Sequence, residues 1–224
     1  MSERTRRQER PDRRRPRHDR PQHSAERAAR QEQRRDDLRE AAIAAIRRHG
    51  AGVSMDQIAA EAGITKPIIY RHFGDRRGLV MAIAHEFVGT LNLEISGSLT
   101  QESTSSEELL RRTVDTYLAF VERDPEVYRF LVRSALGEVP DATDRLGGFI
   151  RQISAQIALV VGERLRQAGQ DSGMAEPWAH ALVGAVHQAG DWWLDRATLP
   201  RERLVDYLMA LLWNGLSSFD PAAD

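Results

Sequence analysis

Apolar residues recur along this chain at intervals of three and four, the spacing of one helix face. No stretch alternates apolar and polar residues as a half-buried strand does. Glycine, proline and small polar residues interrupt the pattern where helices would end. We therefore expect an all-α fold. The predicted helices cover residues 36–49, 54–62, 65–72, 75–95, 107–122, 125–136, 142–168, 175–196 and 201–217.

These helices divide the chain into three parts. Residues 1–35 precede the first predicted helix, residues 36–82 hold three short helices, and residues 83–224 hold the longer ones. The wide apolar faces of the long helices are most simply buried in a helical bundle. With 224 residues, of which 41% are hydrophobic, the chain can bury a substantial core in one or two domains.

The short helices contain a helix-turn-helix centred on Gly63. Ser54 followed by Gln57 has the spacing of a capping box, which satisfies free backbone donors at the start of the first helix of the pair. Gly63 gives the backbone freedom needed at the turn. Thr65 is placed to cap the next helix, and Pro67 is tolerated in its first turn. We expect this second helix to be a recognition helix.

Charge is segregated along the chain. Residues 1–35 hold 13 Arg and six acidic residues, a net charge of +7, whereas the whole chain has a formal charge of −1 and residues 36–224 therefore carry −8. We expect residues 1–35 to form a disordered arm with affinity for polyanions, in which each phosphate contact adds salt-sensitive binding. The alternative is a solubilising leader or an early start codon.

Several classes of protein are excluded or disfavoured by what the sequence lacks. Cysteine is absent, no uninterrupted apolar run approaches the ~20 residues of a membrane span, and the basic N-terminus has no signal-peptide core, so we expect a cytoplasmic protein without a membrane partner. The histidines have no metal-ligand spacing. No phosphate loop, nucleophile elbow or zinc motif is present, so we expect neither an enzyme nor a metal or cofactor site.

The helix-turn-helix carries a family resemblance. The residues concerned are Ile58-Ala-Ala-Glu-Ala-Gly-Ile-Thr-Lys-Pro-Ile-Ile-Tyr-Arg-His-Phe, followed by Asp75-Arg-Arg-Gly-Leu-Val. Over about residues 36–85 the chain resembles the DNA-binding domain of TetR-family regulators. The resemblance implies a homodimer that binds a palindromic operator in double-stranded DNA, with residues 83–224 serving ligand binding and dimerisation.

Eight residues are candidates for DNA contact. Lys66, Ile68, Tyr70 and Arg71 lie near the exposed part of the recognition helix, where such helices meet base edges. Lys66 is the only lysine in the chain, and it can reach a guanine or a phosphate. Arg71 differs from residues common at its place in the family, and it can read guanine. The resemblance implies phosphate contacts at four further positions and at Tyr70. These four are Ser54, Thr65, His72 and Arg76.

Aromatic and aliphatic residues of the C-terminal part are candidates for an apolar ligand pocket. The alternative for each is plain core packing. The predicted pocket residues are Phe87, Leu91, Tyr117, Phe120, Tyr128, Leu131, Phe149, Ile153 and Trp192.

A second resemblance concerns the effector. Asp191-Trp-Trp-Leu-Asp195, and Leu204 to Trp213-Asn-Gly-Leu-Ser-Ser, look like the C-terminal segment of TetR-type regulators of fatty-acid metabolism in actinobacteria. This resemblance implies a lipophilic effector, a long-chain acyl-CoA or a fatty acid, with its head near Arg129 or Arg133. Multidrug and other lipophilic effectors use the same helical shell and stay open as alternatives.

Two helices are candidates for the dimer interface. Small residues in 175–196 allow another helix to approach closely, and 201–217 adds leucines that would bury apolar surface against a symmetry mate. Packing within the same chain is the alternative. The predicted interface residues are Ala181, Gly184, Ala185, Ala189, Leu208, Leu211 and Leu212.

We expect ligand entry to move the helix of residues 75–95 and so change the distance between two recognition helices. Because adjacent major grooves lie about 34–36 Å apart, a small pivot weakens binding, so repression is the expected outcome, with ligand-stabilised activation as the alternative. Two other classes stay open. One is a non-specific DNA-binding protein driven by the Arg-rich arm, and the other is a lipid-binding or enzymatic domain whose helix-turn-helix is only structural.

Overall fold

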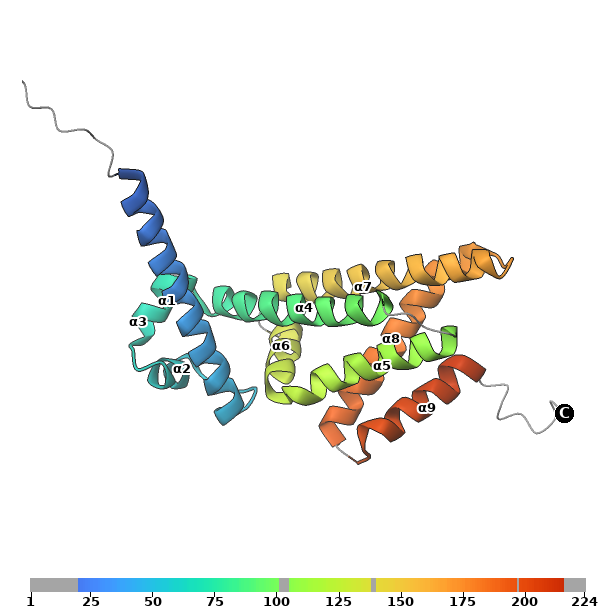
Figure 1. The fold of residues 1–224 in the computed structure, drawn as a ribbon. Coiled ribbons are helices and arrows are strands. Elements are labelled where there is room, and N and C mark those ends of the chain that lie inside the picture. The colour runs from blue at the N-terminus through green and yellow to red at the C-terminus, as the bar shows by residue number, and fades with distance from the viewer. Residues whose placement is uncertain (1–19, 101–104, 138–139, 197, 216–224) are drawn as a thin grey trace, which may run out of the picture. The chain divides into compact units, whose positions relative to one another are not determined.

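The computed structural model describes residues 20–100, 105–137, 140–196 and 198–215, without the side chains of 20–24, 135–137, 140–147 and 149 (Figure 1). Within these ranges the regular structure is entirely helical, as predicted. The elements are α1 (Arg20–His49), α2 (Met55–Glu61), α3 (Lys66–Phe73), α4 (Arg76–Thr100), α5 (Ser106–Arg123), α6 (Pro125–Gly137), α7 (Pro140–Gln167), the 3₁₀ helix η1 (Ser172–Met174), α8 (Ala175–Arg196) and α9 (Arg201–Asn214).

The first helix is longer than the sequence pattern predicts. The chain divides into two compact units, Met1–Asp37 and Leu38–Asp224, and residues 20–35 of the first are helical. For these residues the prediction of a disordered arm is wrong, because alanine, arginine, glutamine and glutamate favour helix without a core. Arg30 and Glu26 add a charge pair one turn apart, at 3.7 Å. The rest of the predicted arm, residues 1–19, lies outside the described residues.

In the second unit, one apolar core joins the three helices of the helix-turn-helix domain to parts of α4 and α6. Its fully buried members include Ile46, Ile58 and Ile69 from the first three helices. Val80 and Phe130 extend the same core into α4 and α6. The short helices α2 and α3 are therefore stabilised by packing against longer ones rather than by their own propensity.

A second core lies among α4, α5, α6, α8 and α9, and Ile153 adds a contact from α7. Leu118 and Val121 of α5 are fully buried there. The helix α7 packs against α8, to which the turn at η1 connects it (Figure 1). This part of the chain has the helical-bundle architecture that the apolar faces predict.

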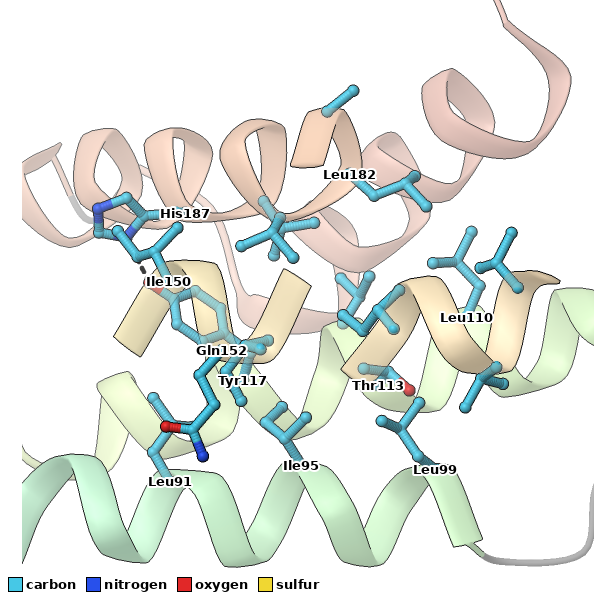
Figure 2. Close-up of a pocket in the computed structure, with 18 of the residues that line it drawn as sticks. Leu91, Ile95, Leu99, Leu110, Thr113, Tyr117, Ile150, Gln152, Leu182 and His187 are labelled. Atoms are coloured by element: carbon cyan, nitrogen blue, oxygen red, sulfur yellow. Dashed lines mark hydrogen bonds between the residues drawn. The ribbon is translucent and has the colours of Figure 1, made fainter. Parts of the chain in front are cut away.

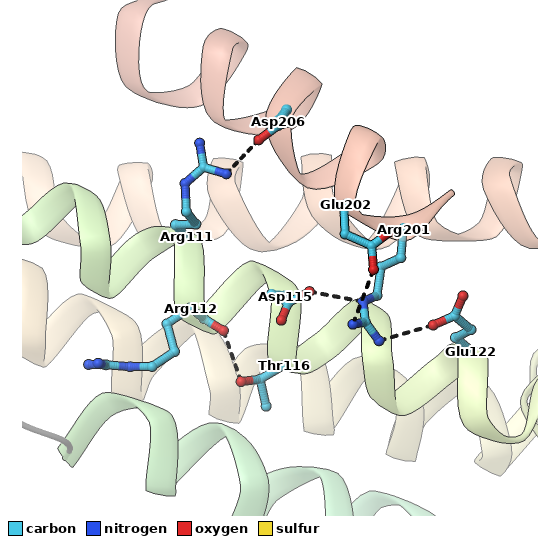
Figure 3. A network of polar contacts seen from close by, with 8 residues as sticks. All are labelled: Arg111, Arg112, Asp115, Thr116, Glu122, Arg201, Glu202 and Asp206. Atoms are coloured by element: carbon cyan, nitrogen blue, oxygen red, sulfur yellow. Dashed lines mark hydrogen bonds and ion pairs between the residues drawn. The ribbon is translucent and has the colours of Figure 1, made fainter. Parts of the chain in front are cut away.

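Charged side chains hold α9 against α5 (Figure 3). Arg201 Nε lies 2.9 Å from Asp115 Oδ1, and its Nη1 donates to Glu122 Oε2 at 3.0 Å. One and a half turns along α9, Arg111 Nη1 donates to Asp206 Oδ1 at 2.6 Å. Multiple pairs across one helix contact fix the register more firmly than a single exposed pair would.

The helix α4 is long and apolar enough, by length and composition alone, to cross a membrane. In this structure it has other partners. Leu91 and Ile95 are buried in the second core, and Glu94 receives two hydrogen bonds from Arg123 of α5, both at 2.8 Å. We therefore interpret α4 as the central helix of the bundle.

Candidate nucleic-acid interface and ligand cavity

The capping box at the start of α2 is confirmed. The backbone N–H of Gln57 donates to Ser54 Oγ at 3.3 Å, and the backbone N–H of Ser54 donates to Gln57 Oε1 at 2.9 Å. At the turn, Gly63 has a φ of +63°, which disfavours any residue with a Cβ. These two features set the orientation of α3 relative to α2.

The cap of α3 differs from the prediction. Thr65 occupies the N-cap position with an extended backbone, but its side chain makes no capping hydrogen bond. Pro67 in the first turn lacks an N–H, which reduces the number of donors that a cap would satisfy. Thr65 is exposed, so its hydroxyl can bond an external acceptor.

The exposed side of α3 carries the predicted base-reading residues. Ile69 and Phe73 face the core and are buried, whereas Arg71 is exposed. Lys66 and Ile68 are half-buried. Lys66 Nζ lies 3.2 Å from Asp56 Oδ2 of α2. An exposed pair of this kind contributes at most about 1 kcal/mol, so the ammonium can exchange its carboxylate partner for a phosphate or a guanine.

The predicted phosphate-contact residues have different surroundings. Ser54 is exposed and His72 is half-buried. Tyr70 is half-buried, and its ring packs against the helix-turn-helix core. Arg76 is tied down: Nη1 donates to the carbonyl of Val53 at 3.1 Å, and the guanidinium carbon lies 5.6 Å from the centre of the Phe130 ring. These contacts give Arg76 a role in holding α4 to the domain.

A side chain caps the start of α4. Asp75 Oδ1 accepts a hydrogen bond from the backbone N–H of Gly78 at 2.7 Å. Position 78 also requires glycine, because a Cβ there would lie only 1.8 Å from the carbonyl oxygen of Phe73. The sequence pattern did not single out Gly78, although it fixes the junction between α3 and α4.

A large apolar cavity lies inside the helical bundle. Its volume is about 1070 Å³, and its described lining comes from α4, α5, α6, α7, α8 and α9. Leucine, isoleucine and valine side chains form most of the wall (Figure 2). A cavity of this size and character suits a lipophilic molecule. Six predicted pocket residues line it, namely Phe87, Leu91, Tyr117, Tyr128, Leu131 and Ile153.

Two predicted pocket residues lie elsewhere. Phe120 is buried in the second core, where its ring meets Phe87 edge to face with the ring centres 4.7 Å apart. Trp192 is 43% exposed and is not among the described lining residues. It follows Asp191 on α8 and points to the outside of the bundle, whereas its neighbour Trp193 is buried. The side chain of Phe149 lies outside the described residues.

A polar cluster breaks the apolar wall. The Tyr117 hydroxyl lies 3.0 Å from His187 Nδ1 and 3.2 Å from the Tyr128 hydroxyl, which itself lies 3.2 Å from His187 Nδ1. The Tyr128 hydroxyl donates a hydrogen bond to Asp191 Oδ1. Burial raises the pKa of Tyr117 and of Tyr128, and for Tyr128 the nearby Tyr117 and Asp191 add to the effect. Both phenols therefore stay protonated at neutral pH.

Among the side chains that the structure describes, the arginine that lines the cavity is neither of the two predicted. Arg129 donates to Glu126 and to the carbonyl of Leu194, and Arg133 is exposed, with Nη1 3.8 Å from a Cβ built on Gly52. Neither lines the cavity, whereas Arg164 of α7 does. The prediction of a head group at Arg129 or Arg133 is therefore not supported by their positions. The sequence did not single out His187 and Arg164 as cavity residues, because polar residues at such places in a helix usually lie at the surface.

The predicted interface residues divide between the surface and the protomer interior. On α8, Gly184 is exposed, Ala185 and Ala189 are half-buried, and Ala181 is exposed but also lines the cavity. On α9, Leu211 is 40% exposed. Leu208 is buried in the second core, and Leu212 lines the cavity, so both are engaged within the protomer.

The helix α6 touches both candidate sites. Phe130 belongs to the helix-turn-helix core and Tyr128 to the second core, and Leu131 lines the cavity while packing in the helix-turn-helix core. Glu126 Oε2 accepts from the backbone N–H of Ala51, just after α1, at 3.1 Å. The helix therefore connects the wall of the cavity to the frame that positions α3.

A neighbouring charge pair strengthens this connection. Arg47 of α1 donates from Nε to Asp124 Oδ2 at 3.0 Å, and Asp124 directly precedes α6. The hydrogen bond to Asp124 raises the pKa of Arg47. Among the side chains that the structure describes, no group of three or more metal-ligating residues comes together.

Two family profiles match the chain. The profile described as "Bacterial regulatory proteins, tetR family" covers residues 38–83, and the one described as "Tetracyclin repressor-like, C-terminal domain" covers residues 98–224. Together they span the helix-turn-helix and almost all of the bundle.

Individual relatives agree with these profiles. An uncharacterized HTH-type transcriptional regulator of Mycobacterium tuberculosis is 33% identical over 82% of this chain and 77% of its own length. The HTH-type transcriptional activator FasR of Mycolicibacterium smegmatis is 25% identical, with 75% of each chain covered. In fold, the chain resembles Bacillus subtilis FadR in complex with stearoyl-CoA, with a TM-score of 0.65 at 14% identity, covering 80% of this chain and 97% of that one.

Proposed function

The protein belongs to the TetR family of DNA-binding transcriptional regulators, and from this premise we propose that it is a repressor whose DNA affinity is lowered by a lipophilic effector in the bundle cavity. Such a protein is a regulator and not an enzyme, and the family is typically dimeric. The observation that carries the proposal is the position of α6. One helix contributes side chains both to the cavity wall and to the core that supports the recognition helix.

The DNA interface in this proposal is the exposed side of α3 and the caps around it. Arg71 and Lys66 read bases or phosphates, since both present charged groups at the surface. The hydroxyls of Ser54 and Thr65, with Tyr70 and His72, supply phosphate contacts that fix the position of the helix on the duplex. Ile68 offers an apolar contact. Arg76 contacts the Val53 carbonyl and the Phe130 ring and so holds α4 to the domain. It can reach a phosphate only if these two contacts break.

The effector in this proposal is a fatty acid or a long-chain acyl-CoA. The cavity is large, bordered by several helices and lined mainly by aliphatic side chains, which favour a flexible hydrocarbon over a compact polar molecule. The relatives support the same class: FadR of Bacillus subtilis was crystallised with stearoyl-CoA, and another fold relative, from Bacillus halodurans, is described as a fatty acid degradation regulator. Other lipophiles are the alternative.

The dimer in this proposal forms through the exposed faces of α8 and α9. Trp192 is 43% exposed and Leu211 is 40% exposed, and small residues at Gly184 and Ala185 leave room for a partner helix. A two-fold axis through such a face places two recognition helices for a palindromic operator. We expect this dimer to act in the cytoplasm.

In the mechanism that we propose, α4 and α6 together transmit a change in the cavity to α3. A chain entering the cavity displaces Phe87 and Leu91 of α4 and Tyr128 and Leu131 of α6, since all four line the wall. Both helices are anchored in the helix-turn-helix core, so their displacement rotates α3 relative to its symmetry mate. A differential affinity of one to three kcal/mol between the two states corresponds to roughly 5- to 150-fold weaker DNA binding.

Fluorescence anisotropy on the DNA upstream of the protein's own gene tests this function. Against a scrambled duplex at near-physiological salt, we expect selective binding that palmitoyl-CoA weakens. Equal affinity for both duplexes would favour non-specific binding by the basic N-terminus over the proposed autoregulation. Selective binding that palmitoyl-CoA strengthens would make the protein an activator or a co-repressor-dependent regulator.

A further inference from the structure

The polar cluster at the cavity has unused hydrogen-bonding capacity. Tyr117, Tyr128 and His187 all line the cavity, and their three polar atoms lie within 3.2 Å of one another. The Tyr128 hydroxyl already donates its hydrogen bond to Asp191. The Tyr117 hydroxyl can donate a hydrogen bond to His187, to Tyr128 or to a bound ligand. Its oxygen also has lone pairs that can accept a hydrogen bond.

A close approach of two helices positions this hydroxyl. Gly190 of α8 lies against Tyr117, since a Cβ at Gly190 would come within 3.2 Å of Tyr117 Cε1. The ring therefore sits against the backbone of α8, next to His187, as Figure 2 shows for the hydrogen bond between the two side chains. The position of the hydroxyl is fixed by packing as well as by hydrogen bonds, which is what a recognition group requires.

A cationic group also lines the cavity, well apart from this cluster. Arg164 lines the wall near the end of α7, two residues after Gly162, whose added Cβ would lie 3.4 Å from Ala175 at the start of α8. No carboxylate pairs with Arg164 among the side chains that the structure describes. His187 is twelve residues beyond Ala175 on α8, a distance of about 18 Å along the helix.

On the basis of the proposed function, we propose that the effector is a long hydrocarbon chain with two polar ends, an anionic group held by Arg164 and a hydroxyl held by the Tyr117–Tyr128–His187 cluster. The aliphatic wall between them takes the chain. A hydroxyl suits the cluster because it can accept the Tyr117 proton and donate to a Tyr117 or Tyr128 lone pair.

The charges set the orientation of this ligand. The Asp191 carboxylate accepts a hydrogen bond from the Tyr128 hydroxyl and lies beside the cluster, so a second carboxylate placed there would be repelled. The same carboxylate at Arg164 would gain a charge-assisted hydrogen bond. A fatty acid therefore enters with its head at Arg164 and its far end toward Tyr117, and a hydroxyl at that far end adds contacts that a methyl group cannot make.

Isothermal titration calorimetry with palmitate and ω-hydroxypalmitate, each below its micelle-forming concentration, tests the hydroxyl site. We expect the full-length protein to bind ω-hydroxypalmitate about three- to tenfold more tightly, the range that one neutral hydrogen bond supports. Tyr117→Phe removes only the hydroxyl and should reduce this ratio to about one. Tyr207→Phe is the matched control, because the Tyr207 hydroxyl contacts Arg203 on α9 and does not line the cavity.

Arg164→Gln tests the anionic end. This variant should weaken both acids by a similar factor and leave the binding of their methyl esters unchanged. Equal affinity of the unmodified protein for the two acids would overturn the hydroxyl site while leaving the proposed lipophilic effector intact. Failure of both acids to bind would overturn the chain-like effector as well. Selective DNA binding, measured separately, would still test the proposed autoregulation.

Discussion

Lys66 illustrates how a single residue can serve two partners. Its ammonium lies 3.2 Å from Asp56 Oδ2, in a pair too exposed to hold it firmly. Its position on the first turn of α3 would let the same ammonium meet a phosphate or a base edge. The geometry thus gives the lysine a resting partner that costs little to exchange.

We expect Lys66→Ala to weaken binding to the specific duplex by about 1–3 kcal/mol, the range for loss of one base or phosphate contact. Competition anisotropy at constant salt measures this. Asp56→Asn is the matched control: it breaks the same ion pair but removes a negative charge near DNA, so binding should be unchanged or tighter. Equal weakening by both variants would mean that the ion pair, rather than a DNA contact, is what matters.

Position 78, between α3 and the rest of α4, has no space for a side chain. An added Cβ would lie 1.8 Å from the carbonyl oxygen of Phe73, so the backbone joining α3 to α4 must move. We expect Gly78→Ala to lower the free energy of unfolding by about 3 kcal/mol, the cost of strong overpacking, and to abolish specific DNA binding. Thermal unfolding followed by circular dichroism measures the first effect. Gly89→Ala, on the same helix with open space around it, should stabilise the protein slightly.

At the residue scale, sequence reasoning succeeded where the chemistry is local. The capping box of Ser54 and Gln57 and the glycine turn depend on neighbours within a few positions, and both are present. Thr65 fills the N-cap position without capping, because side-chain rotamer choice is not encoded in spacing. His187 and Arg164 became visible only when distant helices brought them to one cavity.

At the scale of elements, α6 is the feature that links the two candidate sites. Its N-terminal end is fastened to the helix-turn-helix domain by Glu126 and by Asp124 just before it, while Tyr128 faces the cavity. The sequence pattern predicted α6 as a helix over nearly the same residues but gave no sign that its faces belong to different cores. That assignment depends on tertiary packing.

Removing the hydrogen bond between Glu126 and Ala51 should uncouple the cavity from the DNA interface. We expect Glu126→Ala to bind palmitoyl-CoA with nearly unchanged affinity, because Glu126 does not line the cavity, while the ligand-induced loss of DNA affinity falls severalfold. Anisotropy titrations at zero and saturating palmitoyl-CoA give the ratio. Glu122→Ala is the control, since Glu122 bonds Arg201 between α5 and α9. A full ligand response in Glu126→Ala would exclude this contact from the coupling.

The long first helix shows where element prediction failed. Residues 20–35 lack an apolar face, so a reading based on hydrophobic periodicity assigned them to a disordered arm. Their alanines and charged residues with high helix propensity nevertheless form helix. The later helices, whose apolar faces pack in a core, were predicted to within a few residues.

At the scale of the whole molecule, the exposed apolar side chains of α8 and α9 imply a dimer. We expect Trp192→Arg or Leu211→Arg to convert a dimer into monomers in light scattering, because each places an unpaired charge in a buried interface. Leu93→Arg is the control, since Leu93 of α4 is 77% exposed and lies outside the proposed interface. If all three variants stay dimeric, a different surface forms the dimer.

The central claim is that the cavity and the DNA interface are energetically coupled. Linkage requires that, if a ligand weakens DNA binding by some factor, saturating DNA weakens ligand binding by the same factor. The most direct measurement is the affinity for palmitoyl-CoA by calorimetry, with and without saturating specific duplex. We predict weaker binding in the presence of DNA, by the factor found in anisotropy. Identical affinities with and without DNA would contradict the account.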